Sequence, residues 1–283
     1  MSYTAVFFDL FDTLVHFERD RLPEVEINGK RVRSTAGHLH AVLAAHAPEV
    51  TRERTYAALL ASWQETERLR AIDHREVSAQ ERFAEFFRRL AIDQARMPAG
   101  LDVALIDAHR RELAKAARFP AHYRPLLQRL GRRHRLAVVS NFDYTPTALA
   151  ILEAAGVRDL FAAVVVSDEV GWRKPRADIF QEAIRRTGAD PRRTLFVGDR
   201  ADIDVVGAHG MGMDSAWINP DRDEGTMIES VTVSVSWSWS LRNRRAIFDA
   251  LAAVLMDEVG ATPSRSTNAV AVDAFVSYTV PLA

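Results

Sequence analysis

Four polar side chains that could do chemistry stand beside short apolar runs of the chain. Asp9, Ser140 and Asp199 each come just after such a run, and Lys174 lies in the connection that follows another. In open α/β sheets, ligands bind outside the carboxyl ends of the parallel strands, which meet at one edge. We therefore expect these four side chains to face one another at that edge.

This set of residue types suits phosphoryl transfer. Two carboxylates held close together repel each other unless a cation joins them, and Mg²⁺ prefers oxygen ligands of which one or two are carboxylates. A carboxylate can also attack an electrophile and form a covalent intermediate. A phosphoryl group in transfer needs its charge neutralised, which a metal ion, an ammonium, a hydroxyl or backbone N–H groups can do.

Five apolar blocks predict the strands that would hold these residues. Parallel strands are covered on both faces, so they appear as continuous apolar runs rather than as alternation. The blocks are Ala5–Phe8, Leu136–Val139, Ala162–Val166, Thr194–Val197 and Ser215–Ile218. Helical segments at 145–155, 177–187 and 203–209 lie between or beside the later blocks. This alternation is typical of a doubly wound, Rossmann-like parallel sheet.

The interval from about residue 34 to 117 has a different composition. It is rich in Ala, Leu, Arg and Glu and shows helical spacing, most clearly at Phe83, Phe86, Phe87 and Leu90. Before it, Asn28 and Gly29 stand between short β-prone arms and predict a hairpin, because both residue types tolerate positive φ. We expect a small β-flap and a helical insertion, with a return to the sheet near residue 118.

The C-terminal part gives weaker signals. Residues 231–240 alternate between apolar and polar types, which predicts a strand with one buried face. A helical segment from about 244 to 259 follows, and residues 261–283 show no clear period. We leave residues 257–283 as a tail of unknown order.

Composition excludes several classes of protein. The 283-residue chain has a net charge of −1 and no cysteine. Disulfides and thiolate chemistry are therefore excluded, and no global field favours nucleic acid or an anionic membrane. The first residues do not look like a signal peptide, and no apolar run is long enough for a membrane span. We expect a cytoplasmic protein, a monomer or homodimer, without nucleic-acid or membrane partners.

Four segments in order carry a resemblance to a known family. They are "FFDLFDTLV", "VVSN", "RKPRADIF" and "FVGDRADIDVVGA". The sequence resembles the haloacid dehalogenase (HAD) superfamily of hydrolases, in the branch whose cap is inserted after the first motif. The resemblance implies an α/β fold with a HAD-like catalytic core at 1–16 and 118–256, and a flap and α-helical cap at 17–117.

The resemblance also implies roles for the residues that match the motifs. Asp9 would be the nucleophile and form an aspartyl-phosphate. Thr13 and Ser140 would bind the phosphoryl oxygens, with Asn141 beside them as a substrate-binding residue. Lys174 would neutralise charge.

A Mg²⁺ cofactor is implied as well. Asp9 and Asp199 would bind it, and the backbone carbonyl of Phe11 would be a further ligand. Asp204 matches the second acidic position of the fourth motif, where it would bind the metal through water or orient the lysine. Asp202 competes for that role, although an acid that opens a helix is stabilised there without catalytic duty.

Phe11 departs from the pattern of the family. Most of its phosphatases carry an aspartate at this position, which protonates the leaving group and later activates water. Phe11 can do neither, so the protein uses another acid, acts on a good leaving group, or is not a phosphatase. Asp12 points in a different direction because side-chain direction changes with each step of the chain. Other candidate acids are Glu18, Asp20, His38 and His40, and nothing in the sequence selects among them.

The fourth motif distinguishes the remaining alternatives. Dehalogenases of the family also lack the second aspartate, but they resemble one another in a Ser-Ser-Asn stretch where this chain has Gly198-Asp199. We therefore predict a Mg²⁺-dependent hydrolase of a small phosphate monoester, whose cap closes on the substrate. The alternatives are a 2-haloacid dehalogenase-type hydrolase and a catalytically weak member that binds a phosphorylated ligand or a protein partner.

Overall fold

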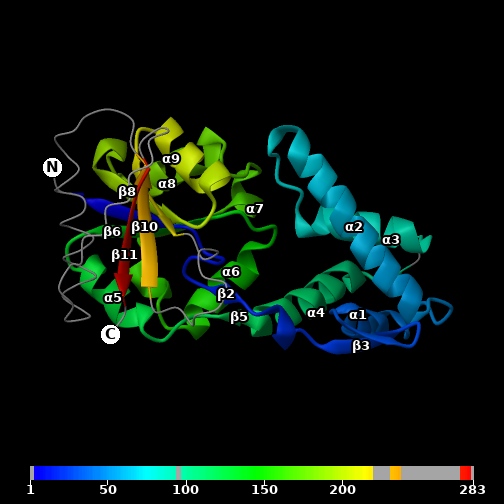
Figure 1. Ribbon diagram of the computed structural model, residues 1–283. Coiled ribbons are helices and arrows are strands. Elements are labelled where there is room, and N and C mark those ends of the chain that lie inside the picture. The colour runs from blue at the N-terminus through cyan, green and yellow to red at the C-terminus, as the bar shows by residue number, and fades with distance from the viewer. Residues whose placement is uncertain (1–2, 94–96, 219–229, 237–274, 282–283) are drawn as a thin grey trace.

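A seven-stranded sheet forms the centre of the larger part of the molecule (Figure 1). The computed structural model describes residues 3–93, 97–218, 230–236 and 275–281. The strand order is β11-β10-β9-β8-β1-β6-β7. The five parallel strands are β1 Ala5–Phe8, β6 Arg135–Ser140, β7 Ala163–Val166, β8 Thr194–Gly198 and β9 Asp214–Ile218. All five blocks that the sequence predicted are strands, and the α/β fold class is confirmed.

The central parallel strands are buried on both faces, as the continuous apolar runs predicted. Along β1, Val6 and Phe8 contribute to one apolar cluster, which also contains side chains of α5 and α6. Ala5 and Phe7 contribute to a second cluster on the other face, which contains side chains of α8 and α9. The helices and turns of this part are α5 Tyr123–Gly131, α6 Thr145–Ala154, η3 Arg158–Leu160, α7 Ser167–Val170, α8 Ala177–Thr187, η4 Pro191–Arg193, η5 Ala201–Val205 and α9 Val206–Gly210.

Among the described residues, four α-helices form the cap, which lies to one side of the sheet in Figure 1. They are α1 Ala36–Leu43, α2 Arg52–Asp73, α3 Ala79–Leu90 and α4 Leu101–Ala116. The Phe83, Phe86, Phe87 and Leu90 stripe is buried in the cap's own apolar cluster. Ser78 and Glu81 form a capping box that begins α3, which satisfies donors the helix start leaves free. The cap therefore has a core separate from that of the sheet.

The predicted flap is a hairpin of β3 Glu24–Ile27 and β4 Lys30–Arg33. Its turn residues Asn28 and Gly29 both have positive φ, of 49° and 74°. The short 3₁₀ turn η1, Arg19–Arg21, precedes it.

Both chain crossings between cap and core lie side by side. β2 His16–Phe17 leads out of the core, and β5 Ala117–Arg118 leads back. The two pair antiparallel, with His16 opposite Arg118 and Phe17 opposite Ala117. The division of the chain at residues 17 and 117 stays a prediction.

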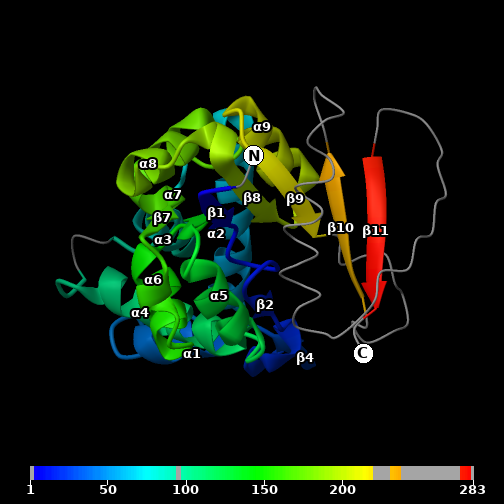
Figure 2. The same ribbon diagram turned by 90° about the vertical axis from the view of Figure 1, so that its left-hand side faces the viewer.

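Two antiparallel strands extend the sheet beyond β9 (Figure 2). β10 Ser230–Ser236 pairs with β9, and β11 Phe275–Pro281 pairs with β10. The alternating segment at 231–240 is thus a strand over the part that the structure describes. The helix expected at about 244–259 lies outside the described residues. Residues 257–283, for which the sequence predicted no defined order, contribute β11.

One predicted helix differs in its first turn. The expected helix at 203–209 begins at Ala201 with the π-helical turn η5, and only then continues as α9. Across the described ranges, no helix combines the length and the apolar character that a bilayer span needs.

Candidate active site

The sheet edge brings Asp9 and Lys174 into direct contact, although 165 positions separate them in the sequence. Asp9 follows β1, and its backbone N–H donates to the carbonyl of Val197 at 2.8 Å, which extends the sheet pairing by one residue. Nζ of Lys174 donates to Oδ1 of Asp9 at 2.5 Å. It also lies 2.7 Å from Oδ1 of Asp204, an ion pair that is not aligned as a hydrogen bond. Lys174 and both acids are buried.

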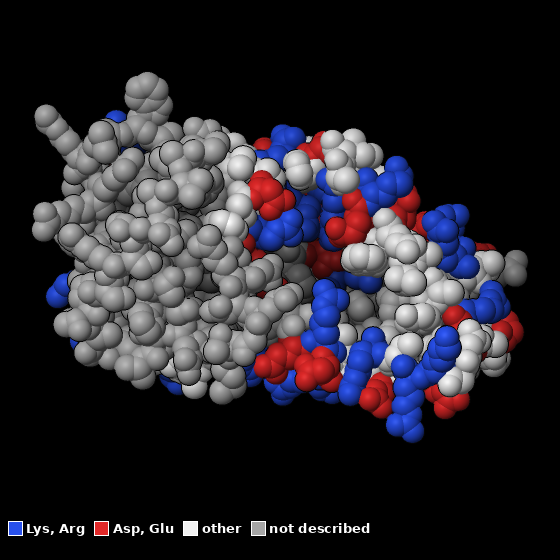
Figure 3. Space-filling model, viewed as in Figure 1, with Lys and Arg blue, Asp and Glu red and all other residues white. Residues whose placement is uncertain are grey.

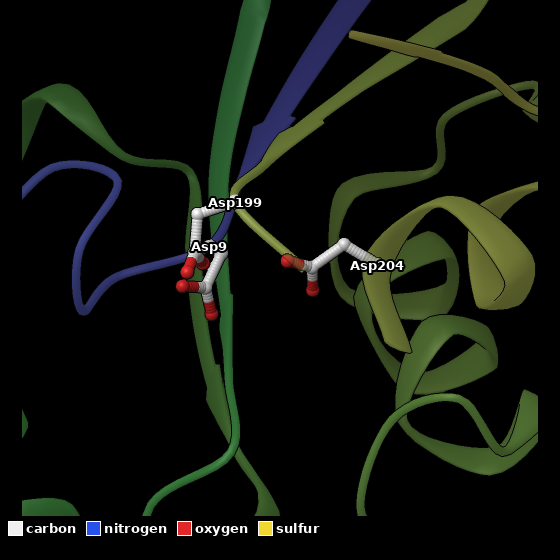
Figure 4. A group of neighbouring side chains, drawn as sticks. All are labelled: Asp9, Asp199 and Asp204. Carbon is white, nitrogen blue, oxygen red and sulfur yellow. The ribbon is translucent and has the colours of Figure 1, made fainter. Parts of the chain in front are cut away.

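A third carboxylate completes the cluster (Figure 4). Asp9, Asp199 and Asp204 each offer a carboxylate oxygen, and these oxygens lie within 4.8 Å of one another. Burial raises the pKa of Asp9 to about 7, against the lowering effect of Lys174, and the charges of the other two acids add to the rise. Burial, followed by the charge of Asp204, raises the pKa of Asp199 to about 6. Ionisation of this cluster is therefore disfavoured unless more positive charge is present.

A divalent cation with oxygen ligands fits this donor set. Three carboxylates around one ammonium leave two negative charges, which one Mg²⁺ would balance. Burial alone would lower the pKa of Lys174, but Asp204 and Asp9 raise it above its usual value. Lys174 is thus held as an ammonium. Its single charge does not balance all three carboxylates, so the cluster still favours a further cation.

The local backbone explains how Asp204 reaches the cluster. Its backbone N–H donates to the carbonyl of Arg200 at 2.7 Å, and its Oδ2 accepts from the N–H of Arg200 at 3.1 Å. A Cβ at Gly198 would lie 2.3 Å from Oδ2 of Asp204, a distance that no side chain tolerates. The glycine before Asp199 is therefore required by close packing. π-helical turns occur frequently at functional sites, and here one carries Asp204.

Asn141 holds the backbone of the lysine in place. Its Nδ2 donates to the carbonyl of Lys174 at 3.0 Å, and its Oδ1 accepts from the N–H of Lys174 at 2.7 Å. This reciprocal pair occupies both ends of the Asn141 amide. The structure therefore places Asn141 as a residue that positions Lys174, whereas the sequence predicted a substrate-binding role.

The two hydroxyl groups that the sequence analysis singled out, those of Ser140 and Thr13, are both buried. Ser140 ends β6, and its Oγ is buried without a hydrogen-bond partner among the described residues. Oγ1 of Thr13, also buried, donates to Oδ1 of Asp199 at a long 3.5 Å. A buried hydroxyl without a partner is rare in folded proteins. Ser140 is thus free to donate to a ligand oxygen.

Phe11 faces an aromatic neighbour. Its ring lies 4.8 Å from the ring of Phe142, centroid to centroid, and both are partly buried. Asp12, next to it, is exposed, has a φ of 58°, and accepts from the N–H of Phe17 at 3.3 Å. Asp12 therefore shapes the loop after β1, as expected of a turn residue.

Three of the four alternative acids, Glu18, His38 and His40, have other partners. Glu18 pairs with Arg21 and Arg118. His38 lies 3.7 Å from Glu112, and Nε2 of His40 lies 3.1 Å from the carbonyl of Val50. These contacts do not single out one of these residues as a replacement for the missing aspartate. Asp202 pairs with Arg200 at 2.8 Å on the surface, which favours its helix-opening interpretation.

Sequence reasoning missed a second buried charge cluster next to the site. Asp143 comes three residues after Ser140 and contacts arginines of the cap. One of the neighbouring arginines, Arg82, is buried on the apolar stripe of α3, one turn before Phe86. An arginine at a core position of a helix is unusual, and this was the signal that could have revealed the cluster.

The family model for haloacid dehalogenase-like hydrolases matches residues 3–212. The chain belongs to this family. It is therefore a HAD-like hydrolase, and the resemblance seen in the four motifs is confirmed.

Curated relatives of this HAD-like hydrolase include phosphatases. It is 34% identical over 127 residues to glyceraldehyde 3-phosphate phosphatase of Methanothermobacter thermautotrophicus, which is 45% of this chain and 56% of that protein. It is 33% identical to pyrimidine 5'-nucleotidase YjjG of Escherichia coli over 100 residues. The aligned segment covers 35% of this chain and 44% of the relative. The chain thus spans about half the length of these relatives.

Solved structures share the fold. A 2-haloacid dehalogenase from Pseudomonas syringae pv. Tomato aligns with a TM-score of 0.57 at 22% identity, covering 80% of this chain and 90% of that one. At this level of identity, the likeness establishes the HAD fold.

Proposed function

We propose that the protein is a Mg²⁺-dependent hydrolase of small phosphate monoesters that works through an aspartyl-phosphate on Asp9. The observation that carries the proposal is the buried cluster of Asp9, Asp199, Asp204 and Lys174, with the free hydroxyl of Ser140 nearby on the neighbouring strand. The phosphatases among the relatives support the same reaction type.

The residues of the site would supply the nucleophile and the charge neutralisation for both steps of such a reaction. A carboxylate oxygen of Asp9 forms a bond to phosphorus while the bond to the leaving oxygen breaks, and the leaving oxygen takes a proton from water. Water then attacks the phosphorus, which releases inorganic phosphate and restores Asp9. Lys174, Ser140 and Thr13 neutralise or hydrogen-bond the phosphoryl oxygens in both steps.

The metal site belongs to the same proposal. Asp9, Asp199 and Asp204 would hold Mg²⁺, with Asp204 acting at least in part through Lys174, which it contacts. When bound, the ion neutralises charge on the phosphoryl group.

Phe11 limits which leaving groups the enzyme handles well. A general acid contributes roughly 10²–10⁴-fold to such steps, and none of the described residues supplies it at this position. We therefore expect faster turnover of aryl phosphates, whose leaving oxygen needs little protonation, than of alkyl phosphates of similar size.

The test compares a panel of phosphate monoesters and 2-haloacids, each with Mg²⁺ and with a chelator. Phosphate release that depends on Mg²⁺, with incorporation of label from ³²P-substrate into wild-type protein that Asp9→Asn abolishes, supports the proposal. Phosphate release that the chelator leaves unchanged contradicts the metal site.

A second candidate function follows from Phe11. A halide leaves without a proton, so a carbon–halogen hydrolase, with Asp9 attacking carbon and the halide departing, needs no acid at this position. Halide release from 2-haloacids that persists with the chelator would support this candidate. Silence in every assay, with retained phosphate binding, would instead support a weak, ligand-binding member.

A further inference from the structure

A cavity of about 290 Å³ lies beside the loop after β1, where the core meets the cap helix α4. Its walls come from the loops after β1 and β6, from the crossing strand β2, and from helices α4 and α6. Core and cap therefore build this cavity together. Six of the nine residues that line it are apolar, namely Phe11, Phe17, Leu113, Ala114, Phe142 and Ile151.

The three polar residues of the lining offer little to a charged ligand. Both ends of the Asn141 amide bond the backbone of Lys174, and the carboxylate of Asp12 accepts from the backbone N–H of Phe17. Thr147 is buried and adds one hydroxyl. Among the described residues that line the cavity, Asp12 is the one acid, and there is no lysine, arginine or histidine. The cavity therefore disfavours an anion and suits an uncharged, apolar group.

The surface around the cap has the opposite character. On the face seen in Figure 3, basic and acidic side chains are mixed over the cap and around the hollow beside the core. Many of these charges belong to pairs three or four positions apart, such as Arg88 with Glu85 and Arg68 with Glu65. Protein interiors leave few voids larger than a water molecule, whereas ligand pockets are mostly apolar cavities of about this size or larger. The apolar cavity is thus a local feature that resembles a ligand pocket.

Two lining residues connect the cavity to the catalytic cluster. Phe11 stands two residues after Asp9, at the position where most phosphatases of the family carry the acid that protonates the leaving oxygen. A side chain at this position borders the leaving group, and here it also forms a wall of the cavity. Asn141 forms another part of the wall and bonds the backbone of Lys174. The leaving group of a phosphate ester bound at Asp9 is therefore directed toward the cavity.

Phe11 and Phe142 give the cavity a wall that suits an aromatic ring. Their ring centroids lie 4.8 Å apart, with an angle of 47° between the ring planes. Aromatic rings attract one another in tilted or offset arrangements at centroid separations of about 4.5–7 Å, and a ligand ring can join such a pair. An apolar cavity of about 150 Å³ is enough to hold benzene. The cavity beside Phe11 therefore has room for one ring and a short linker.

We propose that this cavity binds the leaving group of the substrate, and that the preferred substrate is the phosphate monoester of a small, uncharged alcohol with an aromatic group. The inference rests on the proposed phosphatase function and specifies its substrate class. Phe11, which cannot protonate the leaving oxygen, contributes an apolar contact to the leaving group instead. This contribution comes from burial of apolar surface of the alcohol, so it does not depend on how acidic the alcohol is.

The first test keeps the acidity of the leaving alcohol nearly constant and varies its far end. The substrates are 3-phenylpropyl phosphate, propyl phosphate, 3-hydroxypropyl phosphate and 3-phosphonooxypropanoate. We expect kcat/KM for the phenyl compound to exceed that for propyl phosphate by tenfold or more, since even one methylene in an apolar pocket is worth roughly tenfold or more. The carboxylate should be the poorest. Equal values for the phenyl and propyl compounds, or a preference for the carboxylate, would overturn the assignment.

Variants show whether the cavity causes the preference. Leu113→Asn places an amide in the lining, and Ala114→Leu takes space from the cavity while keeping it apolar. Each should reduce the phenyl-to-propyl ratio of kcat/KM by at least fivefold, mainly through KM. Leu149→Asn is the matched control, since Leu149 of the neighbouring helix α6 is also half-buried but is not among the residues that line the cavity. A ratio that Ala114→Leu leaves unchanged would mean that the ring binds elsewhere, which contradicts the proposal.

Binding separates this inference from the proposed reaction. Calorimetry in the presence of Mg²⁺ uses 4-phenylbutylphosphonate and butylphosphonate, which have a carbon in place of the ester oxygen, and so compares the distal groups without turnover. Binding of the phenyl compound that is at least tenfold tighter, and that Ala114→Leu weakens, would support the cavity even if no phosphate ester were hydrolysed. Equal affinities, or no binding of either phosphonate, in a protein that does hydrolyse phosphate esters would leave the function intact and overturn the apolar leaving-group site.

Discussion

The core and the cap bury charges of opposite sign on either side of one loop. In the core, three carboxylates surround a single ammonium, so the site has room for a cation. In the cap, Arg70 and Arg110 share the carboxylate of Asp143, and Arg70 also pairs with Glu76. Residues 140–143 join the two: Ser140 ends β6 at the edge of the sheet, and Asp143 contacts the cap arginines. The core cluster thus keeps an excess of negative charge, whereas in the cap Asp143 is paired with arginines.

The largest expected effect comes from breaking the core cluster. Asp9→Asn removes the nucleophile while keeping its size, and loss of a nucleophile costs roughly 10⁴-fold or more in kcat. Phosphate release under saturating Mg²⁺ measures it. Asp202→Asn, an exposed acid of the same motif, should retain activity within about twofold, as surface substitutions usually do. An Asp9→Asn protein with undiminished turnover would exclude covalent catalysis by this residue.

Breaking the cap cluster should act first on stability. Asp143→Asn leaves Arg110 and Arg70 without their shared carboxylate, and removing one partner of a buried pair costs about 3–5 kcal/mol. Denaturant unfolding measures the loss. Asp102→Asn, an exposed acid at the start of α4, should change the free energy of unfolding by less than about 1 kcal/mol. Similar values for the two variants would show that Asp143 does not hold the cap arginines.

A substitution at Gly198 tests whether the core cluster depends on close packing. Gly198→Ala would place a Cβ against Asp204, and overpacking costs about 1–3 kcal/mol. We also expect weaker Mg²⁺ activation, because Asp204 must move. Gly210→Ala is the control, since nothing lies within 4 Å of its Cβ position. If Gly198→Ala kept wild-type stability and Mg²⁺ dependence, the position of Asp204 would not matter.

The smallest effect is a difference in pH dependence. Although burial opposes it, the arginines lower the pKa of Asp143, so the unfolded chain binds its proton more readily than the folded protein. The stability that this carboxylate contributes is present above its unfolded pKa of about 3.9 and is lost as pH falls through the lower folded value. The fall in the free energy of unfolding below about pH 4 should be shallower in Asp143→Asn. Parallel pH curves for the two proteins would contradict this.

The fold could be predicted from the sequence wherever burial leaves a simple pattern. Ala5–Phe8 and Thr194–Gly198 are covered on both faces, so they had to be continuous apolar runs, and the polar residues after them had to meet at one edge. The contact between Asp9 and Lys174 follows from that rule together with the family motifs. By contrast, the π-helical turn at 201–205 depends on local hydrogen bonds that no periodicity records.

The charge cluster around Asp143 shows where sequence reasoning ended. Arg82 stands on an apolar helix stripe, which is a visible anomaly, but its neighbours Arg110 and Asp143 come from other elements. Their meeting depends on how the cap helices pack on the loop after β6, and one sequence does not fix that geometry. The amide of Asn141 gives a second case, because its bonds to Lys174 depend on how two distant loops come together.

The paired crossings at His16–Phe17 and Ala117–Arg118 make the cap exchangeable. Because the chain leaves and re-enters the core at neighbouring points, a different insertion with closely spaced ends could be grafted there without rerouting any strand of the sheet. Replacing this one contiguous segment could in this way change the range of substrates while the site residues of the core stay the same.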